Sequence, residues 1–107
     1  MKGLIVRVYF IVSDSLIKIG YSKNPRKRLN QLKTGSGQKL WLCGYMDGNL
    51  DTERQLHKRF NNYKSCGEWY FPNIELIDYI NSVNELNHTL LYENKKLMIY
   101  KNMKFVQ

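Results

Sequence analysis

The sequence predicts a small α/β domain of the α+β class, with a central three-stranded antiparallel sheet flanked by helices and an additional C-terminal helix. The apolar pattern gives the order strand, strand, helix, strand, helix, short strand, helix. The opening hairpin breaks the regular alternation that a parallel doubly wound sheet needs. The chain of 107 residues is long enough for one hydrophobic core and too short for two.

The chain opens with two predicted strands. Leu4–Ser13 is rich in β-branched and aromatic residues, which favour strands. Asp14 and Ser15 are typical turn residues, and Leu16–Tyr21 supplies the second strand. The two strands are therefore expected to pair as a hairpin.

A helix is predicted to follow this hairpin. Asn24 and Pro25 mark its start, because Asn caps helices and Pro is favoured at their first position. Leu29 and Leu32 lie on its inner face, and Gly35 is the predicted stop. Its outer positions carry the basic residues Arg26, Lys27, Arg28 and Lys33.

The middle of the chain predicts one strand and one helix. Lys39–Tyr45 alternates as a strand does, and Met46–Asn49 reads as a turn. Leu50–Phe60 is the second predicted helix, and Asn61–Gly67 is predicted as a loop. Glu68–Phe71 is a short aromatic segment, counted as an optional strand.

A last helix is predicted from Ile74 to about Leu91, with apolar residues every three or four positions. Residues 92–107 fit a longer helix, a strand or an irregular tail. Residues 1–72 are interpreted as the functional domain, and residues 73–107 as a helix and tail packed on it. The alternative for this helix is pairing with a second copy to form a homodimer.

The basic residues are unevenly distributed. The chain carries a formal charge of +8, and residues 1–37 hold eight basic residues and one acidic residue, whereas residues 73–107 hold four of each. A local basic surface favours nucleic acid as the partner, with solubility as the alternative.

Apolar runs and cysteines limit the compartments that fit. No apolar run is long enough for a membrane span, and no cleavage site for export follows the first apolar run. Cys43 and Cys66 are expected to be free thiols in a reducing compartment. We therefore expect a cytoplasmic protein, or an intracellular one in an infected host, and no membrane partner.

Several polar residues are placed together by simple periodicity. Arg7 and Tyr9 share one face of the first strand, and Lys18 and Gly20 share a face of the second. Glu53 and His57 project together because they stand four apart on a helix. Taken singly, each has an ordinary interpretation, as a half-buried strand residue or a solvated surface charge.

The ordered set of these residues resembles a known family. It consists of Val8-Tyr9-Phe10, Lys18-Ile19-Gly20, Arg28-Leu29, Glu53, His57 and Gly67-Glu68-Trp69-Tyr70-Phe71. The set resembles the GIY-YIG endonuclease superfamily, in a branch found in phages, large DNA viruses and some bacteria and fungi. The resemblance covers about Val6–Pro72.

This resemblance implies a GIY-YIG-like fold that cuts DNA phosphodiesters with one divalent cation, Mg²⁺ or Mn²⁺. By position, Tyr9 matches the tyrosine that activates or orients the attacking water. Arg28 matches the arginine that stabilises the phosphate, and Glu53 matches the carboxylate that holds the metal. His57 and Glu68 match positions typical of the branch. These residue types suit phosphodiester chemistry, because negative charge builds on the phosphate oxygens in the transition state.

The sequence departs from the signature at two positions. Arg7 replaces the first signature glycine, where it is expected to narrow the site or contact phosphate. Lys18 replaces the second signature tyrosine, and Tyr21 is a candidate to stand in for it. Asn73 is a candidate for an asparagine that other members carry, with helix capping as the alternative.

The predicted DNA-contacting residues are Arg7, Lys23, Arg26, Lys27 and Lys33. The alternative function is a catalytically weak or inactive nucleic-acid-binding module of the same fold. A basic protein-interaction domain is the third interpretation. In the second interpretation the basic residues bind nucleic acid without cutting, and in the third the last helix pairs with itself or with a partner.

Overall fold

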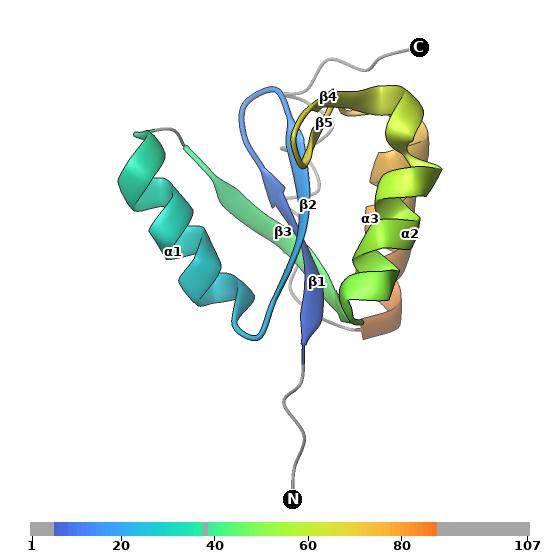
Figure 1. The fold of residues 1–107 in the computed structure, drawn as a ribbon, viewed down its shortest axis with the longest axis horizontal. Helices are drawn as coiled ribbons and strands as arrows, with labels where there is room; N and C mark the ends of the chain where they lie inside the picture. Colours follow the sequence, from blue (N-terminus) through green and yellow to red (C-terminus); the bar gives the residue numbers. More distant parts are fainter. Residues whose placement is uncertain (1–5, 38, 88–107) are drawn as a thin grey trace, which may run out of the picture.

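A computed structural model of the chain describes residues 6–37 and 39–87 (Figure 1). The strands are β1 (Arg7–Val12), β2 (Ile17–Ser22), β3 (Trp41–Asp47), β4 (Lys64–Cys66) and β5 (Trp69–Tyr70). The helices are α1 (Pro25–Ser36), α2 (Leu50–Arg59) and α3 (Ile74–Asn87), with a short 3₁₀ turn at Asn61–Tyr63.

The sheet has five strands in the order β3-β1-β2-β5-β4, and every neighbouring pair is antiparallel. The predicted α+β class is confirmed, but the prediction of three strands is wrong. The segment expected to be a loop contains β4, which has three exposed residues and therefore no alternating apolar pattern. Gly67, at a φ of 57°, turns the chain from β4 back into β5.

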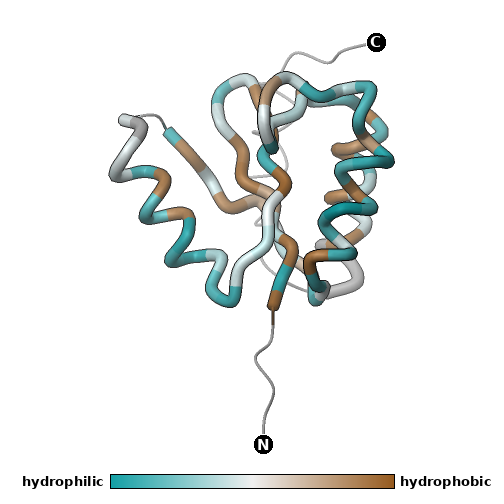
Figure 2. Tube along the Cα trace, viewed as in Figure 1, coloured by the Kyte–Doolittle hydropathy of each residue, from teal (hydrophilic) through white to brown (hydrophobic). Residues whose placement is uncertain are grey.

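Helices cover both faces of this sheet (Figure 1). On one side, Leu29 of α1 packs with Tyr9 and Ile11 in a small core. On the other side, α2 and α3 pack on a larger core that includes Val8 and Phe10 of β1. Figure 2 shows the apolar colour concentrated in the strands, while the helices alternate between apolar and polar positions. Successive residues of β1 therefore belong to different cores, as strand alternation requires.

Helix α1 begins as predicted and ends later than predicted. The Asn24 side-chain oxygen accepts a hydrogen bond from the Lys27 backbone N–H at 3.0 Å, and Pro25 is the first helical residue. Gly35 lies within the helix, and Gly37, at a φ of 65°, forms its C-cap. The left-handed conformation falls on the second of two nearby glycines, so the stop is displaced by two residues.

The turn between β3 and α2 is shorter than predicted, because β3 continues through Asp47. Helix α2 then starts with a reciprocal capping box between Asn49 and Thr52. This cap fixes where the first turn of α2 begins, and with it the positions of Glu53 and His57.

Helix α3 supplies apolar residues to the larger core, namely Leu76, Ile77, Ile80 and Val83. The Asn73 side-chain oxygen accepts a hydrogen bond from the Glu75 backbone N–H at 2.8 Å, as a helix cap does. The predicted continuation to Leu91, and residues 92–107, lie outside the described residues. The division at residue 72 and the pairing of this helix with a second copy stay predictions. Within residues 6–37 and 39–87, no helix is long and apolar enough to cross a membrane.

Candidate active site

Strand β2 is paired along only part of its outer side. Strand β5 pairs with Ile17 and Lys18, and the Ile19 N–H donates to the Glu68 carbonyl at 3.0 Å. Beyond this point, no strand in the described part of the chain pairs with β2 on that side. The free edge around Gly20 is therefore where groups from the two faces of the sheet can meet.

Tyr9 lies across Gly20 of the neighbouring strand. The two residues are direct partners in the β1–β2 register. A Cβ placed on Gly20 would lie 2.4 Å from the Tyr9 hydroxyl oxygen, so no other residue leaves room for this ring. The space that a side chain on Gly20 would occupy is filled by the tyrosine ring, whose hydroxyl lies at the free edge of β2.

The hydroxyl of Tyr9 is held in its protonated form. Burial raises the pKa of Tyr9, and the carboxylates of Glu68 and Glu53 add to this effect. A hydrogen bond with the Arg28 side chain, and its positive charge, act in the opposite direction without cancelling the rise. Tyr9 is thus linked both to the basic helix α1 and to the carboxylates across the edge.

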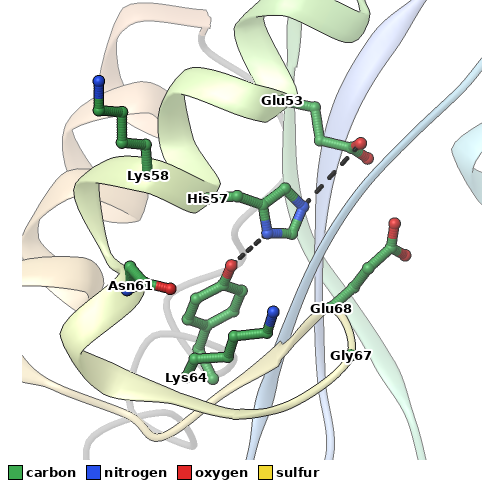
Figure 3. A pocket seen from close by; sticks show the side chains of 8 residues that line it. Glu53, His57, Lys58, Asn61, Lys64, Gly67 and Glu68 are labelled. Atoms are coloured by element: carbon green, nitrogen blue, oxygen red, sulfur yellow. Dashed lines mark hydrogen bonds and ion pairs between the residues drawn. The ribbon is translucent and has the colours of Figure 1, made fainter.

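Glu53 and His57 face the same edge from the other side of the sheet. They stand one turn apart on α2, and Nε2 of His57 lies 3.9 Å from Oε1 of Glu53 (Figure 3). The Glu53 side chain is only 8% exposed. Leu56 of the same helix packs into the larger core and so fixes the rotation of α2.

The other ring nitrogen of His57 is held by a buried tyrosine. Nδ1 of His57 makes a short hydrogen bond with the hydroxyl of Tyr70 on β5. When Nδ1 donates to this hydroxyl, the lone pair of Nε2 is free on the side of Glu53. Tyr70 therefore orients the ring, and the tautomer in which Nδ1 donates to Tyr70 leaves Nε2 available as a ligand.

Glu68 reaches the site from the turn between β4 and β5, where it pairs with Lys18 of β2. Nζ of Lys18 lies 2.5 Å from Oε1 of Glu68 and 5.7 Å from the centre of the Trp69 ring. The Lys18 side chain is 8% exposed. A buried ammonium needs such a partner, and the pair in turn fixes the Glu68 carboxylate.

Glu53, His57 and Glu68 form a cluster that fits a divalent cation. One ligand atom from each lies within 4.8 Å of the others. Oε2 of Glu53 is buried and, within the described structure, makes no hydrogen bond. Carboxylate oxygens suit Mg²⁺ and Mn²⁺, and imidazole adds a ligand that Mn²⁺ accepts more readily.

The ionisation of this cluster agrees with such a role. Burial raises the pKa of Glu53, and the neighbouring Glu68 carboxylate raises it further. Burial lowers the pKa of His57, with smaller contributions of the same sign from Lys64 and Lys18, while Glu68 opposes them. His57 is therefore neutral near pH 7, and a cation would relieve the repulsion between the two carboxylates.

The cluster lies at one side of a pocket of about 460 Å³, which is large enough for a phosphate group. Lys58 and Lys64 both line this pocket, and the Lys58 side chain points away from the cluster (Figure 3). Tyr70 and Lys64 were not among the residues predicted from the sequence. Tyr70 stands only two positions after Glu68 in the same aromatic segment. This short separation is the sequence signal that could have indicated that Tyr70 lies near Glu68.

Other predicted site residues lie elsewhere. Tyr21 is 42% exposed and, by strand alternation, points to the face that α2 and α3 cover. Lys27 and Lys33 are exposed on α1. Arg7 does not line the pocket beside Glu53: its guanidinium lies over the ring of Tyr45, with Nε 3.6 Å from Asp47. It shares a separate pocket with Lys23 and Arg26.

Comparison with known proteins assigns the chain to one protein family. Neither the curated proteins nor the solved structures gave a match. The family model described as the T5orf172 domain matches residues 7–95, from β1 to beyond α3. The chain therefore belongs to the T5orf172 domain family, which is a GIY-YIG-like, nuclease-type family.

Proposed function

We propose that the protein is a divalent-metal-dependent DNA endonuclease that hydrolyses phosphodiester bonds. One observation carries this proposal. A cluster of carboxylates and imidazole on one side of the free β2 edge faces a buried tyrosine and an arginine from the other side. The carboxylates of Glu68 and Glu53 raise the pKa of the Tyr9 hydroxyl, and this electrostatic effect supports a site that the two groups share.

Glu53 is the central metal ligand in this proposal, with His57 and Glu68 completing the set. The bound cation would neutralise charge on the phosphate and acidify water at the site. Tyr70 orients His57 from behind, through the hydrogen bond to Nδ1. Lys18 holds the carboxylate of Glu68 in place through the ion pair between them.

Arg28 supplies the positive charge from the side of α1. Its guanidinium contacts the hydroxyl of Tyr9 and remains exposed for a phosphate to approach. Two N–H groups of a guanidinium match two phosphate oxygens, and this contact strengthens as charge develops in the transition state.

Tyr9 orients the attacking water. Because burial raises the pKa of its hydroxyl, Tyr9 keeps its proton near neutral pH. The hydroxyl can therefore position a water by hydrogen bonding but is a poor general base. Of the two roles that the family resemblance implies, orientation is the one that this environment favours.

The test is nicking of supercoiled plasmid by the purified chain in Mg²⁺, Mn²⁺ or EDTA. We expect metal-dependent nicking that Glu53→Ala abolishes, because the substitution removes the central ligand. Asp51→Ala is the matched control, since Asp51 stands in the same first turn of α2 but is exposed and outside the cluster. Circular dichroism would show that both variants fold.

Two results would contradict the proposal. One is nicking by Glu53→Ala at the parent rate. The other is DNA binding by the parent without cleavage in any divalent metal, together with gel retardation that fades as salt increases. The second result would support the alternative, a binding module of the same fold. The tight Lys18–Glu68 pair is the feature that favours this alternative, since the ammonium neutralises one of the three ligands.

A further inference from the structure

A second pocket lies at the start of α1, on the face of the sheet that α1 covers. It measures about 360 Å³, and three cationic side chains line it, those of Arg7, Lys23 and Arg26. Tyr45 of β3 lies beside them. We call it the basic pocket; none of these residues lines the pocket beside Glu53.

The guanidinium of Arg7 is held in a fixed orientation at the wall of the basic pocket. It stacks on Tyr45, with 5.1 Å from its central carbon to the ring centre. Its Nε is buried, 3.6 Å from Asp47, and makes no hydrogen bond among the described residues. The Asp47 side chain is 83% exposed, so it neutralises Arg7 only weakly.

Positive charge dominates the rest of the basic pocket. Lys23 and Arg26 are exposed, and the first turn of α1 carries no acidic residue. The first turn of α2, in contrast, carries Asp51 and Glu53. Two guanidiniums and one ammonium around a small cavity suit an oxyanion with several acceptor oxygens.

The basic pocket is close to the candidate active site along the same strand. Arg7 and Tyr9 are two residues apart on one face of β1, which places their Cα atoms roughly 6.6 Å apart. Tyr45 is the β3 partner of Tyr9 in the sheet register. A polyanionic chain with one phosphate at Tyr9 and Arg28 would therefore pass over the basic pocket.

We infer that the basic pocket holds a backbone phosphate of the DNA other than the one that is cut. The identity of the ligand rests on the proposed function, because DNA is the polyanion that the active site would take. The role of Arg7, Lys23 and Arg26 is to bind and align the strand, so their contribution is made equally in the bound substrate and in the transition state.

The first measurement is DNA binding in EDTA, where no cleavage takes place. Fluorescence anisotropy with a labelled duplex at several KCl concentrations gives the affinity and its salt dependence. For Lys23→Gln/Arg26→Gln we expect weaker binding and a logarithmic salt slope reduced by about two, since each lost phosphate contact removes about one. Arg26→Lys should keep the slope and lose affinity, because it preserves charge without the planar fork.

Lys39→Gln is the matched control. Lys39 is also an exposed cation, but it stands between α1 and β3 and does not line the basic pocket. We expect this variant to keep the parent affinity and slope. Cleavage in Mn²⁺ adds a second readout: the double variant should raise KM and leave kcat within about twofold.

The inference would be overturned if the double variant bound DNA with the parent affinity and salt slope, or no more weakly than Lys39→Gln. A fall in kcat with KM unchanged would also overturn it, because it would place these residues in the chemical step. A protein that never cleaves DNA but binds it through the basic pocket would instead contradict the proposed function. The inference that the basic pocket holds a backbone phosphate would then still be supported.

Discussion

The two faces of the sheet differ in both core size and charge. The face under α2 and α3 holds the larger core, and it presents Glu53 and His57. The face under α1 holds a small core around Tyr9 and Ile11, and it presents cationic side chains. Glu53 and His57 are therefore anchored on the side with the larger core, and the cationic groups proposed to contact phosphate lie on the side with the smaller core.

This division has a physical reason. Carboxylates close to each other repel unless they are held, and the large core around α2 supplies that rigidity. Arginine and lysine side chains instead need solvent to reach a ligand, so an exposed helix with few core contacts suits them. Both Arg28 and the carboxylates act on the Tyr9 hydroxyl beside Gly20, where β5 no longer pairs with the edge of β2.

Of the substitutions that probe the two faces, Arg28→Ala is expected to have the largest effect, a fall in cleavage rate. Removing one group that stabilises the transition state should lower the cleavage rate by about 10² to 10³-fold. Lys27→Ala is the control, because Lys27 precedes Arg28 on α1 and is also exposed. Equal loss in both variants, measured as single-turnover cleavage rates, would show that α1 contributes only general positive charge.

A second prediction concerns the contact between Gly20 and Tyr9 at the free edge of β2. Gly20→Ala places a Cβ 2.4 Å from the Tyr9 hydroxyl, so the buried ring must move. We expect a loss of about 1–3 kcal/mol in the free energy of unfolding, and slower cleavage. Denaturant unfolding measures the first effect and plasmid nicking the second.

Gly35→Ala is the matched control for this substitution. Gly35 lies in α1, with no atom within 4 Å of its hypothetical Cβ. Alanine has a higher helix propensity than glycine, so this variant should be as stable as the parent or up to about 1 kcal/mol more stable. A Gly20→Ala protein that unfolds like the parent would show that Tyr9 is not confined by Gly20.

The smallest effect is expected from Glu53→Gln, as a change in melting temperature. Burial raises the pKa of Glu53, so its ionised form destabilises the fold near pH 7. Glu53→Gln should therefore melt at a higher temperature than the parent at pH 7. This difference should shrink as pH falls through the raised pKa of Glu53, because the parent then takes up a proton and loses the buried charge.

The melting temperatures of the same two proteins can also be compared with Mn²⁺ present. Mn²⁺ should raise the melting temperature of the parent and leave that of Glu53→Gln nearly unchanged, because only the folded parent has the full ligand set. If Mn²⁺ stabilised both proteins equally, Glu53 would not be a ligand. A parent that melts above Glu53→Gln at pH 7 without metal would contradict the assigned effect of burial.

Local sequence signals predicted much of the fold. The capping pair Asn24-Pro25 placed the start of α1, and strand periodicity placed Lys18 and Gly20 on one face of the second strand of the hairpin. Helical spacing put Glu53 and His57 side by side, as the structure has them. Each of these features depends on residues only a few positions apart, or on one hairpin, where periodicity is informative.

The features that the sequence did not predict depend on long-range contacts. Lys18 and Glu68 are fifty positions apart, and His57 meets Tyr70 only after the β4–β5 hairpin folds back. Strand β4 has no buried side chain that would mark it. Arg7 was expected to narrow the site or to contact phosphate, and the sequence did not show that it would lie over Tyr45 and beside Asp47.

The most direct test of whether the two faces form one site is a double-mutant cycle. Arg28→Lys and Glu53→Asp keep charge and leave slow but measurable cleavage in Mn²⁺. Single-turnover rates would be measured for both variants and for the double variant. If Arg28 and Glu53 act on one phosphate in one transition state, the double variant should be about as slow as the slower single variant. Losses that multiply in full would show that they act independently, which would contradict a shared site at the edge of β2.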